Sequence, residues 1–281
     1  MAQSALREPE GRGRGAAPAA KEYGVNTRVL HYAVLLSVAA LLLVTNIDGY
    51  DLWPPDEPRF AEVAREMIQS GDFLVPRVNG EPYLEKPPLL FWAIAAASAP
   101  FGEVTSVSAR LPSIIAALIA LLCTYRLASR LMGARVGLWS AIVLMTNVRF
   151  AWQGRMGQID MLLTACLSAA FLAFWRWHET PRRRWLFTFY AAIAMAVYAK
   201  GPVGILLPLM LAIAFYWHKR DRRRRLHLFW GMLGIAVAIG AWLIPARMAA
   251  ATDLGATAGS LVAGNLFRQT VGRFFLGVSH A

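Results

Sequence analysis

The chain has 281 residues, of which 57% are hydrophobic and only 16% are charged. Soluble domains carry about 25% charged residues, and several apolar runs here approach the roughly 20 residues that cross a bilayer. This composition excludes an ordinary soluble domain and predicts an all-α polytopic membrane protein. The formal net charge of +12 indicates either a nucleic-acid partner or a strong orientation signal in a membrane.

The chain begins with a small, polar and basic stretch, residues 1–28, which we interpret as a disordered cytoplasmic tail. Apolar runs then predict a transmembrane bundle over residues 29–246. The seven predicted spans are 29–47, 107–128, 136–152, 159–175, 185–199, 201–217 and 227–246. Residues 247–281 are expected to form a periplasmic segment that stops without closing an element, as in the N-terminal part of a longer protein.

The distribution of arginine sets the predicted orientation. An eighth apolar run, 87–101, is short, and whether it crosses decides which way all later segments face. If it does not cross, the tail and the loops near 126–135, 176–184 and 219–225 share one side and hold 18 of the 29 Lys and Arg residues. Cytoplasmic loops carry such an excess. We therefore expect a cytoplasmic N-terminus, and we interpret the positive charge as an orientation signal rather than a nucleic-acid site.

The predicted first outer loop, 48–106, contains two helices that we expect to rest on the membrane surface. Residues 56–71 open with Asp56, a good N-cap, and stop at Gly71. Apolar residues recur there with helical spacing, at Phe60, Val63, Ala64, Met67 and Ile68. Run 87–101 predicts a second, partly embedded helix, and the link 70–80 is expected to be extended.

Charged residues of both signs lie at the ends of these two helices, at the outer membrane–water boundary. They are Asp56, Glu57, Arg59, Glu85 and Lys86. Structural interpretations stay open beside functional ones. Asp56 could serve only as a helix cap, and Arg59 could pair with a glutamate one turn away. Glu85 and Lys86 could form a surface pair that stabilises little.

Two further charged residues mark the outer ends of later spans. Asp160 opens the fourth span, shortly after Arg155, and Lys200 lies between the fifth and sixth spans in the sequence AKGPVG. Ionisable residues in apolar surroundings are expensive and tend to be functional. The alternatives are that Asp160 caps its helix and that Lys200 only extends its amine to the membrane surface.

This mixture of charges predicts chemistry on a lipid-linked anion. Lys86, Arg59, Lys200 and Arg155 could hold a lipid phosphate by charge-assisted hydrogen bonds and stabilise it as a leaving group. A neighbouring carboxylate could accept the proton of an acceptor hydroxyl. The chain has no Asp-x-Asp signature of nucleotide-sugar enzymes. Together these features predict glycosyl transfer from a lipid-phosphate sugar.

Three stretches resemble a known family of membrane enzymes. They are residues 56–92 (DEPRFAEVAREMIQSGDFLVPRVNGEPYLEKPPLLFW), 108–113 (SARLPS) and 199–204 (AKGPVG). They resemble bacterial glycosyltransferase family 39 and its aminoarabinose (ArnT-like) lipid A transferases, which have the GT-C fold and use polyprenyl-phosphate sugars. The resemblance covers about residues 29–281, and members of the family are longer, with more spans and a C-terminal periplasmic domain.

The resemblance implies roles for individual residues. Asp56 matches a catalytic acidic position whose motif Glu57 and Arg59 complete, and Asp160 matches a second acidic position. The implied substrate-binding residues are Lys86 and Glu85 of the EKPP turn, Arg59, Lys200 of the KGP turn, Arg155 and Tyr83. No residue is assigned as a metal ligand, and the resemblance leaves the use of a divalent metal ion open.

The function implied is an inverting glycosyltransferase of the bacterial inner membrane with a periplasmic active site. Its expected partners are the bilayer, an undecaprenyl-phosphate sugar and an envelope acceptor, with lipid A phosphate first and a protein hydroxyl, as in protein O-mannosyltransferases, second. A lipid or solute transporter and an inactive scaffold are the alternatives from other classes. A transporter predicts a polar path through the spans, whereas here the charges collect at one face, which favours interfacial chemistry.

Overall fold

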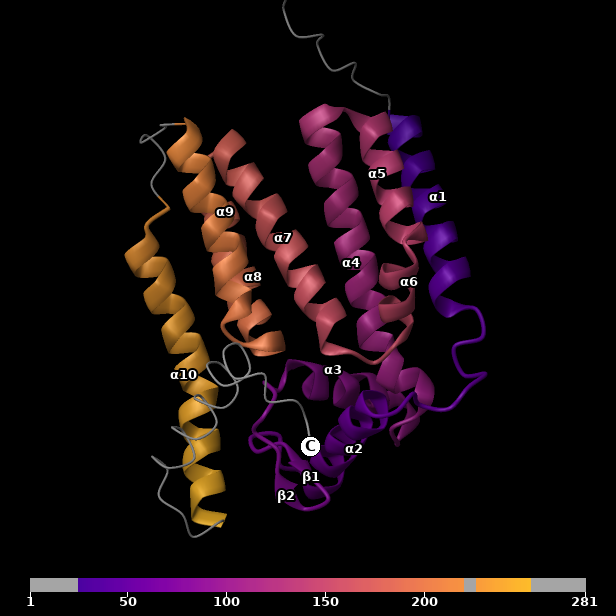
Figure 1. Ribbon diagram of the computed structural model, residues 1–281, viewed down its shortest axis with the longest axis vertical. Helices are drawn as coiled ribbons and strands as arrows, with labels where there is room; N and C mark the ends of the chain where they lie inside the picture. The colour runs from indigo at the N-terminus through magenta and orange to yellow at the C-terminus, as the bar shows by residue number, and fades with distance from the viewer. Residues whose placement is uncertain (1–24, 220–225, 254–281) are drawn as a thin grey trace, which may run out of the picture.

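The computed structural model describes residues 25–219 and 226–253 (Figure 1). Residues 1–24 of the expected tail 1–28, the arginines within 220–225, and residues 254–281 of the expected outer segment 247–281 lie outside these residues. The helices of the bundle are α1 (Val25–Val44), α4 (Ser106–Met132), α5 (Ala134–Thr146), α6 (Val148–Arg155), α7 (Ile159–Glu179), α8 (Arg183–Lys200), α9 (Val203–Lys219) and α10 (Leu228–Asp253). The first loop contributes α2 (Asp56–Ser70), β1 (Arg77–Val78), β2 (Glu81–Pro82), α3 (Leu89–Ser98) and the 3-10 turn η1 (Ala99–Phe101).

Every predicted span has a helical counterpart, although the helices differ in length. Among the described residues, α1, α4, α7 and α10 are long and apolar enough to cross a membrane, whereas α5 and α9 are shorter apolar helices. α1 begins at Val25 and α10 continues to Asp253, so both extend beyond their predicted bounds of 29 and 246. The chain is therefore a helical, polytopic membrane protein.

The predicted third span, 136–152, is wrong as a single helix. The chain breaks at Asn147, which has an extended backbone and accepts a hydrogen bond from the Phe150 amide at 3.1 Å through its side chain. An asparagine in this position caps the following helix and competes with helix continuation. The result is α5 followed by the short α6, which ends at Arg155 beside α1 (Figure 1).

Small residues let the central helices approach closely. α4 packs along α7, and its buried face includes Ala109, Ala116, Ala117 and Ala120, each at most 4% exposed. In a membrane the driving force for such contact is dispersion between close backbones, since lipid tails are as apolar as the side chains. α4 and α7 are therefore in close contact along much of their length.

The layer formed by α2, α3 and the two strands lies across one end of this bundle (Figure 1). α2 has nearly the predicted bounds and ends at Gly71, whose left-handed φ of 70° suits glycine. Phe60, Val63, Ala64 and Met67 are buried as predicted. Ile68 is exposed instead, because the buried stripe of α2 runs through Glu57 and Ala61 at its other edge.

The link 70–80 is not simply extended, because its second half is part of a hairpin. β1 and β2 pair antiparallel around Asn79 and Gly80, with φ of 54° and 80°, and Asn-Gly is the sequence that such tight turns prefer. The carboxylate of Glu66 on α2 accepts hydrogen bonds from the amides of both turn residues, at 3.1 Å for Gly80. The hairpin is thereby held against α2.

Two tryptophans hold the first half of the link. The indole N–H of Trp92 on α3 donates to the Phe73 carbonyl at 2.8 Å, and that of Trp242 on α10 donates to the Leu74 carbonyl at 3.0 Å. The two rings also meet edge to face. The loop layer is therefore joined to the bundle on the α10 side.

Candidate active site

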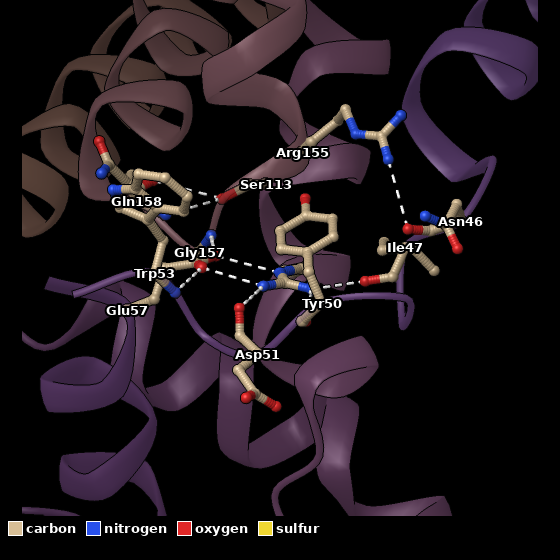
Figure 2. Close-up of polar contacts among 11 residues, drawn as sticks. Asn46, Ile47, Tyr50, Asp51, Trp53, Glu57, Ser113, Arg155, Gly157 and Gln158 are labelled. Carbon is tan, nitrogen blue, oxygen red and sulfur yellow. Dashed lines mark hydrogen bonds and ion pairs between the residues drawn. The ribbon is translucent and has the colours of Figure 1, made fainter.

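Glu57 is the most deeply buried acidic residue of the first loop. Its side chain is fully buried, and both carboxylate oxygens accept hydrogen bonds (Figure 2). Oε2 accepts from the Trp53 amide at 2.7 Å and from Arg110 Nη2 at 3.1 Å, and Oε1 accepts from the Gly157 amide at 2.6 Å and from Arg110 Nε at 3.2 Å. Both oxygens of Glu57 are therefore engaged by protein groups, and its predicted catalytic role stays a prediction.

Arg110, on α4, is the partner of Glu57 and was missed among the predicted site residues. Its side chain is fully buried, and Nη1 donates to the carbonyls of Ile47 and Tyr50 while Nη2 donates to that of Asp51 at 2.8 Å. The guanidinium also lies over the Tyr50 ring, 3.9 Å from its centroid. The sequence did carry a signal for Arg110, which is a charged residue in SARLPS at the start of an apolar run. Ionisable residues in such surroundings tend to be functional.

The linker between α6 and α7, residues 156–158, leads into the first turn of α7, which carries the second acidic residue of the site. Besides the bond from Gly157 to Glu57, the Gln158 amide donates to Ser113 Oγ of α4 at 3.1 Å (Figure 2). Gly157 is required here, since a Cβ at this position would lie 2.8 Å from the Ala109 carbonyl oxygen. The linker is therefore in direct contact with α4 at Gly157. This residue lies two positions before the start of α7 and three before Asp160.

Asp160 and Lys200 meet, as their predicted positions at one end of the bundle imply. Lys200 Nζ forms an ion pair and hydrogen bond with Asp160 Oδ1, and the two side chains are 44% and 37% exposed. Asp160 lies in the first turn of α7 and Lys200 in the last turn of α8, where each charge also suits the helix dipole. Both side chains of the pair are therefore partly exposed at this end of the bundle.

A second group of charges surrounds Tyr83, whose side chain is buried beside Phe91. Burial raises the pKa of the Tyr83 phenol, and the adjacent Arg59 opposes this increase, while the carboxylates of Glu85 and Asp56 add to it. These three charged residues therefore lie near one phenol. Asp56 is the first residue of α2, Pro55 occupies the N-cap position, and no side chain makes a capping hydrogen bond there. The interpretation of Asp56 as the N-cap is therefore wrong.

Three further predicted site residues, Arg155, Glu85 and Lys86, differ in burial and in their contacts. Arg155 donates to the carbonyls of Leu42 at 2.9 Å and Thr45 at 2.6 Å, and so caps the end of α1. Figure 2 shows its longer contact with the Asn46 carbonyl, at 3.4 Å. Glu85 is exposed, and Lys86 is half-buried in the turn that precedes α3. The structure therefore brings Arg59, Glu85 and Tyr83 together with Asp56, and it gives Arg155 a role in holding α1.

An apolar cavity of about 690 Å³ lies beside Arg155. Its lining comes from the end of α1, the loop after it, α5 and α6: Leu42, Tyr50, Trp53, Met145, Thr146, Val148, Ala151, Trp152 and Arg155. Trp53 and Trp152 meet edge to face within this lining, 5.8 Å between ring centroids. Among the described residues no group of His, Cys, Asp and Glu side chains is arranged to hold a metal ion.

Comparison with known proteins agrees with these features. Residues 85–245 match the family model described as dolichyl-phosphate-mannose-protein mannosyltransferase. An undecaprenyl phosphate-alpha-4-amino-4-deoxy-L-arabinose arabinosyl transferase from Shewanella sediminis is 33% identical over 174 residues, which cover 59% of this chain and 31% of that protein. The enzyme of the same name from Pseudomonas savastanoi is 30% identical over 195 residues, covering 68% of this chain and 36% of that protein.

Solved structures give the same result for the fold. The crystal structure of ArnT from Cupriavidus metallidurans bound to undecaprenyl phosphate matches with a TM-score of 0.70 and 29% identity, covering 80% of this chain and 42% of that one. Its apo state matches with a TM-score of 0.69 and 30% identity. The all-α polytopic fold is therefore of the GT-C type. The chain spans about a third of the length of the curated relatives that it matches.

Proposed function

The chain belongs to the dolichyl-phosphate-mannose-protein mannosyltransferase family, and from this premise we propose that it is an inverting glycosyltransferase that uses a polyprenyl-phosphate sugar. One observation carries the proposal. Acidic and basic side chains come from α2, from the turn before α3 and from the facing ends of α7 and α8. These elements lie at one end of an apolar helical bundle (Figure 1). A lipid-linked donor would place its phosphate and sugar there while its hydrocarbon chain stays among the helices.

In the proposed reaction, an acceptor oxygen attacks the anomeric carbon of the sugar as the bond from that carbon to the phosphate oxygen breaks. Attack from the opposite face inverts the anomeric configuration. The bonding electrons leave with the polyprenyl phosphate, which gains negative charge. Lys86 and Arg59 are the proposed groups that stabilise this charge, since fixed cations aimed at developing charge lower the barrier. Lys200, with Asp160, is proposed to orient the donor.

Asp56 is the proposed acceptor of a proton. A protein or sugar hydroxyl must lose its proton as it attacks, and a carboxylate within reach can take it. A phosphate acceptor is already ionised, so Asp56 would then mainly orient the reactants. Glu85 is proposed to face the sugar, and Tyr83, whose buried phenol lies beside Arg59, is proposed to belong to the same substrate-binding group.

The proposed donor and acceptor rest on the relatives. Two of the similar proteins are named as aminoarabinosyl transferases, and a similar solved structure holds undecaprenyl phosphate. The apolar cavity beside α1 and α6 is consistent with a lipid substrate. We therefore propose undecaprenyl-phosphate aminoarabinose as the donor and lipid A phosphate as the acceptor.

A second candidate shares the mechanism and differs in the acceptor. The family description names a protein mannosyltransferase, which favours a protein hydroxyl as acceptor and a hexose as the transferred sugar. In that case the reaction depends on Asp56 as a base, because the hydroxyl proton must be removed.

The proposed location is the inner membrane of a bacterium, with the N-terminus in the cytoplasm. The excess of Lys and Arg in the loops at the opposite end of the bundle from α2 and α3 supports this orientation. Loop 48–106 is then the first periplasmic loop and carries much of the active site. The proposed cytoplasmic tail would then end where α1 begins, at Val25, and the proposed periplasmic segment would follow α10, which ends at Asp253.

The test is mass spectrometry of lipid A and envelope glycans. We would compare cells with the intact gene, cells without it, and cells that carry Asp56→Asn at equal protein level. The proposal predicts loss of one pentosamine from lipid A phosphate in the deletion and in the variant. Loss of a hexose from protein would assign the second candidate. No change in either, in cells that make the donor, would contradict a glycosyltransferase.

A further inference from the structure

We propose that Arg110 and Glu57 form a positioning pair that sets the spacing of the two acidic residues Asp56 and Asp160. Neither member of the pair is placed to touch a substrate, because both side chains are fully buried. They act through the backbone segments that they bind. This inference rests on the proposed function for its kinetic consequences, but not for its structural ones.

The pair is saturated with hydrogen bonds. Arg110 offers five N–H donors, and these meet two oxygens of Glu57 and the carbonyls of Ile47, Tyr50 and Asp51. Glu57 in turn accepts from two backbone amides besides Arg110. A buried ion pair survives desolvation only when its geometry is good and its remaining lone pairs and protons are satisfied. Here both conditions hold.

The bonds of the pair join four separate segments. They are the loop 47–53 after α1, the first turn of α2, the start of α4 and the linker between α6 and α7. Asp56 directly precedes Glu57, and Asp160 follows Gly157 by three residues. Each of the two acidic residues is therefore within three residues of this buried pair or its bonded backbone. The hydrogen bond from the Gly157 amide to Glu57, at 2.6 Å, links the segment that carries Asp56 to the segment that carries Asp160.

Stability alone does not explain this arrangement. Replacing a buried ion pair by well-packed apolar residues is often neutral or stabilising, so such a pair is weak evidence for a role in stability. What apolar residues cannot do is accept from the Gly157 and Trp53 amides and donate to three carbonyls at once. The pair thus specifies where the loop and the linker sit. A glycosyl transfer needs that accuracy, since a 1 Å misplacement can cost roughly 100-fold in rate.

The first experiment uses the double substitution Glu57→Leu with Arg110→Met in the full-length protein. This variant removes both charges together, so it avoids the unpaired buried charge that either single substitution would leave. Two amides and three carbonyls lose their partner in this variant, so we expect a lower melting temperature in detergent, and the kinetics are measured on protein shown to be folded. We expect kcat for sugar transfer to fall by roughly 100-fold, with little change in KM for the polyprenyl-phosphate donor. A folded variant with the parent kcat would overturn the proposal.

The second experiment measures the spacing without using the reaction. Asp56→Cys and Asp160→Cys would carry spin labels, with Cys123 and Cys166 replaced by alanine. We expect one narrow distance distribution with the native pair and a broad or shifted one with the double substitution. An unchanged distribution in the variant would overturn the inference. Because this readout needs no turnover, it separates failure of the positioning role from failure of the proposed function.

A third variant, Gly157→Ala, tests the link itself with no change of charge. Its Cβ would approach the Ala109 carbonyl oxygen to 2.8 Å, so the linker must move away from α4 and from Glu57. We expect the same loss in kcat and the same broadening between labels as in the double variant. Gly234→Ala is the matched control, because a Cβ there meets nothing within 4 Å. Parent behaviour of Gly157→Ala in both readouts would contradict the link.

Discussion

Lys200, at the end of α8, forms an ion pair with Asp160, at the start of α7, and both side chains stay accessible. Two charges placed in this way join adjacent helices at the end of the bundle where α2 and α3 lie (Figure 1). An accessible ion pair contributes only about 0–1 kcal/mol to stability. Its position, rather than its strength, is what the proposed function uses.

Substitution of this pair should therefore affect activity far more than stability. We expect Lys200→Ala to lower kcat for sugar transfer by roughly 100-fold, because a donor that is no longer correctly oriented loses about that much in rate. The melting temperature should stay close to that of the parent. Arg130→Ala is the control, since it breaks an exposed pair with Glu179 at the other end of α7. Equal loss of activity in both variants would argue against a specific role for Lys200.

Lys86 is predicted to bind the donor phosphate. We expect Lys86→Ala to weaken binding of undecaprenyl phosphate by at least about tenfold, which corresponds to the 1.5–3 kcal/mol of a hydrogen bond to a charged group. Arg65→Ala removes the same charge from an exposed position on α2, where Arg65 pairs with Glu62, and should bind as the parent does. Binding measured by titration in detergent separates the two. Unchanged affinity in Lys86→Ala would remove this role.

The phenol of Tyr83 should stay neutral over the working pH range. Burial raises its pKa above the usual value of about 10. Because the pKa is raised in the folded state, the contribution of the neutral phenol to folding stability is complete below about pH 10 and is lost as the pH rises through the folded-state pKa. If activity falls between pH 7 and 10, we therefore expect the midpoint of that fall to lie at the same pH in Tyr83→Phe as in the parent. A shift of that alkaline limb in Tyr83→Phe would show that the phenol ionises there.

Glu66 should matter for the stability of the first loop. Its carboxylate accepts from the amides of Asn79 and Gly80, and Glu66→Ala leaves both donors without that partner. Because the turn is exposed to water, we expect a loss of about 1–2 kcal/mol in the free energy of unfolding. Glu62→Ala, one turn away in an exposed pair with Arg65, should lose less. Proteolysis of the hairpin in native detergent solution would report the difference.

Much of the architecture followed from the sequence because membrane spans have a strong and simple signal. Apolar length located the spans, and helical spacing located α2 to within one residue at its C-terminal end. The alternation of spans placed Asp160 and Lys200 at the same end, and the structure pairs them. Such arguments need no knowledge of side-chain contacts.

The network around Glu57 could not be predicted in the same way. Patterns of hydrophobicity treat a glutamate as a water-facing residue, and the partner of Glu57 lies on another helix, at Arg110. One signal was present, since Glu57 is three residues before Phe60 and so lies on the apolar stripe of α2. The break at Asn147 and the Asn79–Gly80 hairpin also had local signals, in capping and turn chemistry.

The most direct measurement is a transfer assay with the purified full-length protein. It would receive undecaprenyl-phosphate aminoarabinose and lipid A, and the release of undecaprenyl phosphate and the mass of lipid A would be followed together. We predict one sugar gained per donor consumed, with inverted anomeric configuration, and loss of both signals in Asp56→Asn. If the protein binds undecaprenyl phosphate but transfers no sugar to lipid A or to any hydroxyl acceptor, the proposal of a glycosyltransferase is contradicted.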